Sequence, residues 1–456
     1  MAQSEYDCIV IGSGPGGYVA AIRAAQLGKR TVVVEADKVG GRCLNYACIP
    51  AKAILRSADV LSEINDSEQF GLRVADVQVD YPAVQQRREK VVGTLTSGVS
   101  GLFKKDNIEL IEGRASLTPE GQVSVGGATI ASPTIIVATG SVPVPVPGTQ
   151  FDGRVIGTED VYALPELPAR LAVVGAGASG VEIASAFARL GSEVLLLEAL
   201  ERVLPTEDAD ISRLVERGLK RQGVQVHTAT PVAEVSASDS GVSFSYGGEH
   251  AEVDYLAIAA GRRADVDGLG LGEAGVEVEE RGLVQVDGAL RTSRNGIYAI
   301  GDLVAGPALA HKASDEGIIA AEDSAGLATH PLAHVDIVRA TFCKPNVGSF
   351  GLTEEEAVEQ GYEVVVGKVG YGAVGGGTAY GDRTGMIKIV GERRYGELLG
   401  GHIVGSRATE MIHELVNARA LEGGYAEVAR IVHGHPTLSE AVMEAARAAD
   451  GWLIHG

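Results

Sequence analysis

Two cysteines five positions apart, Cys43 and Cys48, are the residues of this chain whose type and spacing most clearly suggest chemistry. Pro50 follows them, and proline is tolerated in the first turn of a helix because its missing N–H would be unpaired there anyway. We therefore expect a helix over residues 51–64, with Cys48 at its N-terminus. The partial positive charge of a helix N-terminus favours a thiolate by roughly 1 kcal/mol, and such a thiol is reactive.

Three interpretations of this cysteine pair compete. A structural disulfide is disfavoured, because the chain has only four cysteines and its start, residues 1–5, lacks the basic and apolar regions of a secretory signal. A zinc site needs four ligands, and no second CxxC or HxxH cluster supplies them. A disulfide that is reduced and re-formed during turnover is the favoured interpretation. Cys8 and Cys343 lie in strand-like runs and are expected to be buried, inert thiols.

A dinucleotide-binding βαβ pattern begins at Gly12. An apolar strand precedes Gly12, a helix follows Gly17, and a second strand ends at Glu35. In such a unit Gly12 permits a tight turn, Gly14 lets the backbone approach a pyrophosphate, and Gly17 brings helix and strand together. Glu35, 23 residues after Gly12, is placed to accept hydrogen bonds from a ribose.

The same pattern occurs a second time, with Gly175, Gly177, Gly180 and an acid, Glu198, again 23 residues after the first glycine. Two fingerprints predict two bound dinucleotides, and together with a cysteine pair they predict an electron-transfer relay. An acid at the end of the second strand accepts ribose hydroxyls of NAD and repels the extra phosphate of NADP.

Two further buried strands end in glycine, over residues 135–140 and 255–261, and each is expected to close one nucleotide-binding sheet. Prolines alternating with valines over residues 143–147 predict a stiff connector between domains.

The cysteine segment (residues 40–52), both fingerprints and the His-Gly-His-Pro-Thr run at residues 433–437 together resemble the flavin-dependent pyridine nucleotide–disulfide oxidoreductases, over nearly the whole chain. The resemblance implies an α/β fold: two Rossmann-like dinucleotide-binding domains, for FAD and for NAD, plus a C-terminal α+β dimerisation domain. It implies four consecutive segments, namely an FAD-binding segment 1–147, an NAD-binding domain 148–263, a return to the FAD-binding or central domain over 264–335, and a dimer-interface domain 336–456.

The resemblance also implies catalytic roles. Cys43 matches the thiol that exchanges with substrate, and Cys48 matches the thiol next to the flavin. His435 matches the general base, with Glu440 as the residue that orients it, although Glu440 also fits a capping box with Thr437 as N-cap. Two more charged residues, Lys52 and Glu182, match an ion pair beside the reactive nitrogen of the flavin; the alternative is two unrelated surface charges.

Further residues are implied to contact the cofactors. Beside the first fingerprint, those expected at FAD are Arg42, Lys52, Thr139, Gly140, Asp302 and Ala310, and Gly261 is expected at NAD with the second. No metal is implied. The chain departs from the common family pattern at Arg42, Tyr46, Ala47 and Ala51, where the family commonly has Thr, Val, Gly and Ser. Arg42 could stabilise a thiolate or contact a flavin phosphate.

Within the family, Glu198 and the cysteine-free end at residues 452–456 favour the dihydrolipoamide dehydrogenase branch over reductases that use NADPH or extra terminal thiols. This branch implies NAD⁺-dependent oxidation of dihydrolipoamide on a lipoyl-bearing protein or 2-oxoacid dehydrogenase complex by a homodimer. The alternatives are an NAD(P)H-dependent reductase of another small disulfide, glutathione-reductase-like or mercuric-reductase-like, and a flavin-bearing carrier subunit with a vestigial redox centre.

Composition sets the outer limits. A chain of 456 residues is too long for one hydrophobic core, so two to four domains are expected. A formal net charge of −21 argues against partners such as nucleic acid and anionic membrane, which bind cationic surfaces. No uninterrupted apolar run reaches membrane-spanning length, and we expect a cytoplasmic protein.

Overall fold

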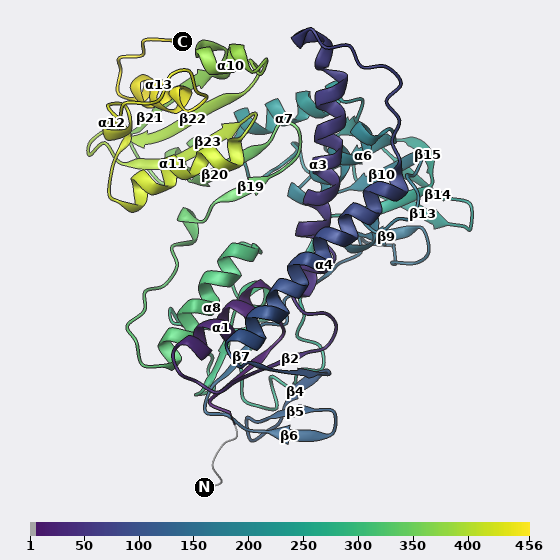
Figure 1. The fold of residues 1–456 in the computed structure, drawn as a ribbon, viewed down its shortest axis with the longest axis vertical. Helices are drawn as coiled ribbons and strands as arrows, with labels where there is room; N and C mark the ends of the chain where they lie inside the picture. Colours follow the sequence, from purple (N-terminus) through teal and green to yellow (C-terminus); the bar gives the residue numbers. More distant parts are fainter. Residues whose placement is uncertain (1–5) are drawn as a thin grey trace. The chain divides into compact units, whose positions relative to one another are not determined.

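The computed structural model describes residues 6–456, so the start of the chain, in which no secretory leader was expected, lies outside the described residues. The chain forms two compact units (Figure 1). The first unit comprises residues up to 53 together with 82–144 and 261–334, and the second comprises residues 54–81, 145–260 and 335–456. The finer division into four domains remains a prediction.

A five-stranded parallel sheet organises the first unit, in the order β18-β7-β1-β2-β3. Its strands are β1 (Cys8–Ile11), β2 (Thr31–Glu35), β3 (Glu109–Glu112), β7 (Ile135–Val137) and β18 (Ile297–Ala299). Apart from the edge strand β3, the runs are apolar, buried and rich in β-branched residues, as expected for strands covered on both faces. The expectation that the strand after residue 135 closes this sheet was wrong: β7 lies inside it, because the chain returns after residue 261 and adds β18 outside.

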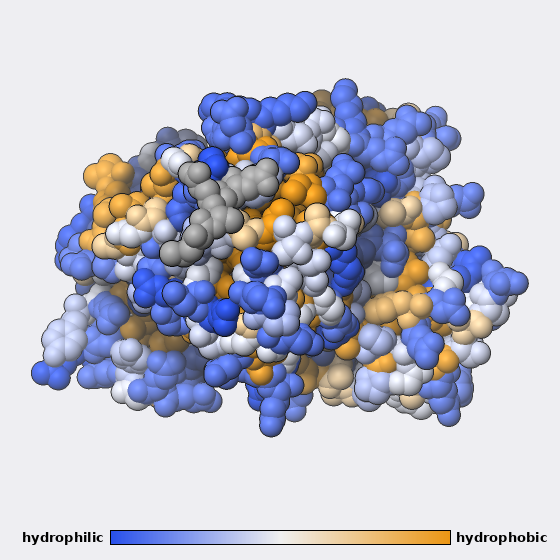
Figure 2. All heavy atoms as spheres, turned by 90° about the horizontal axis from the view of Figure 1, so that it is seen from below, coloured by the Kyte–Doolittle hydropathy of each residue, from blue (hydrophilic) through white to orange (hydrophobic). Residues whose placement is uncertain are grey.

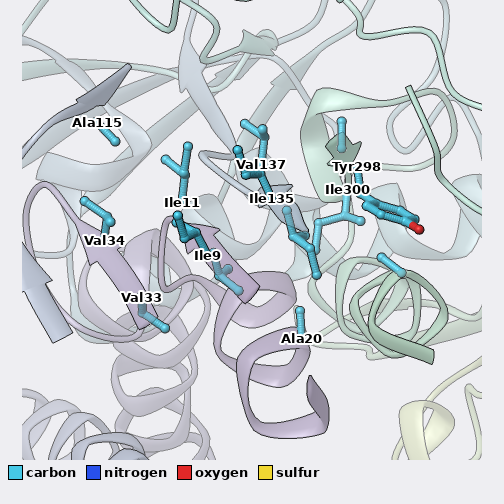
Figure 3. Packing of buried hydrophobic residues seen from close by; sticks show 14 of the residues in the cluster. Ile9, Ile11, Ala20, Val33, Val34, Ala115, Ile135, Val137, Tyr298 and Ile300 are labelled. Atoms are coloured by element: carbon cyan, nitrogen blue, oxygen red, sulfur yellow. The ribbon is translucent and has the colours of Figure 1, made fainter. Parts of the chain in front are cut away.

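Side chains from these strands form one core with the flanking helices (Figure 3). Ile9 of β1 pairs with Val32 of β2 on one side and with Ile135 of β7 on the other. Helices α1 (Pro15–Gln26) and α8 (Ala310–Ser324) pack against each other (Figure 1). They approach closely at Gly317, where a Cβ would lie 2.5 Å from the carbonyl oxygen of Gly16.

The remaining elements of the first unit are the long helix α4 and several short pieces around this sheet. A β4-β5-β6 meander and a β8-β17 pair are antiparallel. These elements are α2 (Gly41–Asn45), α4 (Tyr81–Lys105), β4 (Ala115–Leu117), β5 (Val123–Val125), β6 (Ala128–Ile130), β8 (Ser141–Pro143), β17 (Arg262–Ala264) and the 3-10 turn η2 (Gly301–Leu303).

The second unit contains a parallel sheet of the same design, in the order β12-β11-β10-β16-β9. Its elements are β9 (Val155–Gly157), α5 (Thr158–Val161), β10 (Arg170–Val174), α6 (Ala178–Leu190), β11 (Glu193–Leu197), α7 (Ala209–Arg221), β12 (Gln225–His227), β16 (Tyr255–Ile258) and a meander of β13 (Val232–Ala237), β14 (Val242–Tyr246) and β15 (Glu249–Val253). As in the first sheet, the strand expected to close it, β16, lies inside, with β9 at the edge.

An antiparallel sheet, β19-β20-β23-β22-β21, makes up the C-terminal part of the second unit. Its elements are η3 (His334–Asp336), β19 (Arg339–Thr341), β20 (Val347–Gly351), α9 (Glu354–Glu359), β21 (Val364–Gly370), η4 (Tyr371–Ala373), α10 (Gly375–Ala379), β22 (Met386–Glu392), β23 (Leu398–Val404), α11 (Ala408–Ala420), α12 (Tyr425–Val428) and α13 (Glu440–Ala449). The mixture of parallel and antiparallel sheets confirms the expected α/β fold with an α+β C-terminal part.

Helix α3 (Cys48–Asn65) begins three residues before the predicted start, so Cys48 itself is its first residue; η1 (Ser67–Phe70) follows. Over residues 6–456, no helix is long and apolar enough to cross a membrane. Hydrophilic residues cover most of the face in Figure 2, with apolar residues in scattered patches among them.

Candidate functional site

A cavity of about 410 Å³ lies in the first unit, where the first fingerprint meets the cysteine segment. Both predicted redox cysteines, Cys43 and Cys48, line it. Most residues expected at FAD line it as well, namely Gly12, Gly14, Glu35, Arg42, Thr139, Gly140, Asp302 and Ala310. Gly17 and Lys52 are not among its lining residues. Segments far apart in the sequence therefore converge on one cavity.

The fingerprint glycines act through close backbone contacts. A Cβ on Gly17 would lie 1.9 Å from the carbonyl oxygen of Gly12, which has φ +96°. The second fingerprint repeats this contact: a Cβ on Gly180 would lie 1.8 Å from the oxygen of Gly175, with φ +98°. Each contact lets a helix start directly beyond the end of its strand. The helix N-terminus, which favours bound anions, then faces the space where a pyrophosphate would lie.

Glu35 and Glu198, the acids at the end of the second strand of each fingerprint, accept equivalent backbone hydrogen bonds. In the first fingerprint the backbone N–H of Ser13 donates to Glu35 Oε2 (2.7 Å), and that of Asp37 donates to Oε1 (2.9 Å). In the second, the N–H of Ala176 donates to Glu198 Oε2 (2.6 Å) and that of Leu200 to Oε1 (2.9 Å). A carboxylate oxygen has two lone pairs, and the hydroxyl of Ser13 also donates to Glu35 Oε2 (2.6 Å), so Glu35 Oε1 and both oxygens of Glu198 can still accept a ribose hydroxyl.

The cysteines lie where a redox pair requires them. Cys43 and Cys48, both half-buried thiols, hydrogen-bond to each other, and this contact is the main reason why the pKa of Cys43 is raised. Burial raises that pKa further, whereas the charges of Lys52 and Arg42 lower it. Once one thiol ionises, the other holds its proton, since two thiolates in contact repel. The first turn of α3 favours ionisation of Cys48.

The other two cysteines are fully buried, as expected. Burial raises the pKa of Cys8 to about 12, so its thiol stays protonated and inert at neutral pH. In residues 6–456, no three His, Cys, Asp or Glu side chains group as they would around a metal ion.

A buried ion pair holds the backbone beside Asp302. Lys312 Nζ lies 3.0 Å from Glu316 Oε1, and both side chains are at most 2% exposed. The ammonium donates to the carbonyl oxygen of Gly301 (2.9 Å), and the N–H of Gly301 donates to Glu316 Oε2 (2.7 Å). The N–H and the carbonyl oxygen of Gly301, the residue before Asp302, are therefore both hydrogen-bonded by this ion pair. Burial raises the pKa of Glu316 despite the neighbouring ammonium.

The side chain of Asp302 is fixed from another direction. Ser141 Oγ donates to Asp302 Oδ2 (2.5 Å), and Arg262 Nε donates to Ser141 Oγ (2.8 Å). Asp302 Oδ2 is therefore hydrogen-bonded to Ser141, which Arg262 holds in turn. The remaining lone pairs of the Asp302 carboxylate can still accept hydrogen bonds at the cavity wall. The cavity thus combines a helix N-terminus for a pyrophosphate, an acid for a ribose, and a second acid and the two cysteines in the same wall, so the residues present fit FAD.

The second fingerprint brings together all but one of the residues expected at NAD. Gly175, Gly177, Gly180 and Glu198 lie at one end of β10 and β11 in the second unit. Gly261 belongs to the first unit, and its part in binding NAD remains a prediction.

His435 and Glu440 lie together, as expected. His435 Nδ1 is 2.9 Å from Glu440 Oε1, and the imidazole is 75% exposed, so Nε2 is available to another molecule. The N–H of Thr437 donates to Glu440 Oε2 (2.8 Å). Burial opposes ionisation of Glu440, but these two hydrogen bonds outweigh it and lower the pKa of this carboxyl group. An ionised Glu440 holds the imidazole in one orientation.

The expected capping box forms only in part, since the N–H of Thr437 donates to Glu440 but the hydroxyl of Thr437 does not cap the helix. Helix α13 starts at Glu440 with Ser439 as its N-cap, and the hydroxyl of Thr437 donates to the carbonyl oxygen of Gly434 (2.7 Å) instead of accepting from the helix. Glu440 is therefore bound to the histidine segment. The neighbouring His433 is paired with Glu414 (Nε2 to Oε1, 2.5 Å), and that hydrogen bond raises the pKa of His433.

Lys52 and Glu182 lie in different units, and their pairing remains a prediction. Within the first unit, the Lys52 charge acts on Cys43, where it favours a thiolate. Within the second unit, Glu182 is 4% exposed and accepts the N–H of Phe342 (2.9 Å).

Sequence reasoning missed four residues that hold the predicted ones in place: Ser13, Ser141, Arg262 and Glu316. The spacing of Glu316 four residues after Lys312 was a usable signal, because such residues share one face of a helix. Ser141 and Arg262 carry no local signal, since they meet Asp302 only through the tertiary fold.

We predict that Lys312→Met destabilises the flavin-loaded protein by about 3–5 kcal/mol, because it leaves the buried carboxylate of Glu316 without its counter-charge. The matched control is Arg23→Met, which removes the partner of Glu322, a residue of the same helix α8, from across the contact with α1. That pair is 33% and 25% exposed, so its loss should cost no more than about 1 kcal/mol. Urea unfolding followed by circular dichroism and flavin absorbance measures both; equal losses would contradict the positioning role of Lys312.

Comparisons with known proteins agree with this geometry. Residues 6–317 match the family model described as pyridine nucleotide-disulphide oxidoreductase, and residues 337–446 match the dimerisation domain of the same family. Among curated relatives, dihydrolipoyl dehydrogenases are 40% identical in Bacillus subtilis (99% of each chain) and 42% identical in Chlorobaculum tepidum (97% of each chain).

Solved structures of two relatives superpose over nearly the whole chain. LpdA from Mycobacterium tuberculosis has a TM-score of 0.90 at 27% identity and covers 96% of this chain and 99% of its own. The HOCl-induced flavoprotein disulfide reductase RclA from Escherichia coli, as a Cu(II) complex, has a TM-score of 0.88 at 27% identity and covers 97% and 99%. With its paired thiols and twin fingerprints, the chain belongs to the pyridine nucleotide–disulphide oxidoreductase family.

Proposed function

We propose that this chain is a dihydrolipoamide dehydrogenase, which oxidises dihydrolipoamide with NAD⁺ through FAD and a redox-active Cys43–Cys48 pair. The observation that carries the proposal is the pair of hydrogen-bonded thiols in the wall of a cavity built on a dinucleotide fingerprint. The dihydrolipoyl dehydrogenases among its relatives, matched along their full length, support the choice of substrate.

The protein residues account for the exchange of thiols and disulfide. His435, oriented by Glu440, takes a proton from one thiol of dihydrolipoamide, and the resulting thiolate attacks Cys43 of the Cys43–Cys48 disulfide. Cys48 leaves as a thiolate, which the N-terminus of α3 stabilises. The second substrate thiol, after losing its proton, attacks the mixed disulfide and releases Cys43. The substrate leaves as lipoamide, and the cysteine pair has gained two electrons.

FAD, when bound, supplies the step that a thiol pair alone lacks: it accepts these two electrons and passes them as a hydride to NAD⁺. The first fingerprint, Glu35 and Asp302 are the residues that would hold FAD, and the second fingerprint with Glu198 would hold NAD⁺. Arg42 and Lys52 are the cations whose charges favour the thiolate form of Cys43. The balance is dihydrolipoamide + NAD⁺ → lipoamide + NADH + H⁺.

The proposal includes the assembly. The family dimerisation domain at residues 337–446 supports a homodimer, and His435 lies in that domain. In such a dimer we propose that His435 acts on the cysteine pair of the partner subunit. The substrate would be carried by a lipoyl-bearing protein, such as that of a 2-oxoacid dehydrogenase complex, in the cytoplasm.

Turnover of dihydrolipoamide tests the function directly. The purified protein should bind FAD and reduce NAD⁺ with dihydrolipoamide at a kcat/KM at least tenfold above that for glutathione or for other small thiols and dithiols. Cys43→Ser and Cys48→Ser should each abolish this activity while retaining flavin. Preferential turnover of another substrate, such as glutathione disulfide or Hg²⁺ with NADPH, would make the chain a reductase; no turnover despite bound FAD would favour a carrier with a vestigial redox centre.

We predict that NADH is preferred over NADPH by at least about a hundredfold in kcat/KM. The 2′-phosphate of NADPH would face the carboxylate of Glu198, and placing like charges together costs several kcal/mol, of which about 2.8 kcal/mol is already a hundredfold. Initial rates of lipoamide reduction with each cofactor measure the ratio. Glu198→Gln, which keeps the size but removes the charge, should narrow it; equal kcat/KM values in the unaltered protein would refute this role of Glu198.

We predict that two inactive variants, Cys48→Ser and His435→Ala, restore activity when their subunits exchange. In a mixed dimer with shared sites, one site carries both defects and the other carries neither. With random, equal pairing half of the dimers are mixed, so activity should approach about a quarter of the unaltered protein. Mixed dimers demonstrated by tag exchange but without activity would show that the base and the disulfide belong to the same subunit.

A further inference from the structure

The cysteine segment makes a contact with the rim of the flavin cavity that the exchange of thiols does not use. Tyr46, between the two cysteines, donates its hydroxyl hydrogen to Asp37 Oδ2 (2.6 Å), and Lys38 Nζ lies 5.0 Å from the centre of the Tyr46 ring. Tyr46 and Asp37 both line the cavity. Asp37 is the residue whose N–H holds Glu35 Oε1. The contact therefore joins the redox segment to the end of the cavity where the ribose acid lies.

The segment between Asp37 and Tyr46 is also hydrogen-bonded to the fingerprint loop. The N–H of Gly40 donates to the carbonyl oxygen of Ser13 (3.1 Å) and to its hydroxyl (3.2 Å), and Ser13 Oγ donates to Glu35 Oε2 (2.6 Å). Asn45 Nδ2 donates to the carbonyl oxygen of Gly41 (2.9 Å). Residues 37–46 are therefore held in place by several hydrogen bonds, and the Tyr46 hydroxyl makes the one at the C-terminal end of this segment.

The second fingerprint provides an internal comparison, since its backbone contacts to Glu198 are the same. Leu200 stands at the position of Asp37, has no carboxylate to accept a hydrogen bond, and is 55% exposed. Ala176 stands at the position of Ser13 and has no hydroxyl. The two nucleotide sites therefore share a backbone design, and these side-chain ties belong to the first.

We propose that the Tyr46–Asp37 hydrogen bond is a latch over the ribose end of the first nucleotide cavity that slows the release of FAD. The inference rests on the proposed function, in which FAD stays bound through many turnovers and NAD⁺ must exchange in each. Burial, and then the hydrogen bond to Asp37, raise the pKa of Tyr46 to about 12, so the phenol remains a donor at neutral pH.

The rate of FAD release from the flavin-loaded protein tests the latch, measured by ultrafiltration over time and absorbance of the filtrate. Tyr46→Phe should release FAD about tenfold faster, because a hydrogen bond to a charged group contributes about 1.4 kcal/mol or more. Asp37→Ala should have a similar effect, and the double variant should be no faster than the single ones. The matched control is Tyr246→Phe, which removes a tyrosine–carboxylate hydrogen bond to Glu249 in the second unit and should leave FAD release unchanged.

The thermal midpoint of the FAD-free protein separates a latch from a structural bond. A latch predicts that Tyr46→Phe leaves this midpoint unchanged and lowers only that of the flavin-loaded protein. Equal losses in both forms, or FAD release within twofold of the unaltered protein, would overturn the latch while leaving the proposed function intact. An unaltered protein that binds no FAD would overturn both.

Discussion

The contact between the carbonyl oxygen of Gly12 and the Cα of Gly17 is the constraint on which the flavin site depends. Because no Cβ intervenes, α1 starts directly beyond the end of β1, and the unpaired N–H groups of its first turn open into the cavity. Glu35 accepts the N–H of Ser13, and this hydrogen bond links the end of β2 to the turn that follows β1. The same contact between Gly175 and Gly180 builds the second site.

This design explains why so much of the site could be predicted from the sequence. Each fingerprint lies within 24 consecutive residues, and its glycines are required by contacts between neighbouring turns rather than by distant partners. The cysteine pair was recognisable for the same reason, since Cys43 and Cys48 meet across a single turn. The order of β1, β2 and their helix follows from local pattern, and so does the acid at the end of each second strand.

What could not be predicted depends on segments that meet only in the folded chain. The edge position of β18 depends on the return of the chain after an entire second sheet. The network from Arg262 through Ser141 to Asp302 joins residues up to 161 positions apart, and no spacing rule identifies them. Spacing alone predicts a capping box between Thr437 and Glu440, yet the Thr437 hydroxyl donates to Gly434, while Glu440 accepts the N–H of Thr437 with one oxygen and contacts the imidazole of His435 with the other. These partners are close in sequence, and which of them pair depends on the conformation of residues 434–440 rather than on their spacing.

A relay with two nucleotides has a further requirement that the shared backbone cannot meet. Suppose that both fingerprints held their ligands equally tightly. Either FAD would then be lost between turnovers, or slow release of the nicotinamide nucleotide would limit the rate of every turnover. The contacts from backbone N–H groups to Glu35 and Glu198 agree in partner and in length, so they cannot produce different residence times. Side chains around each fingerprint can produce the difference, and in the latch proposed above Asp37 and Tyr46, next to the Ser13–Glu35 contact, do so with hydrogen bonds that Ala176 and Leu200 cannot make.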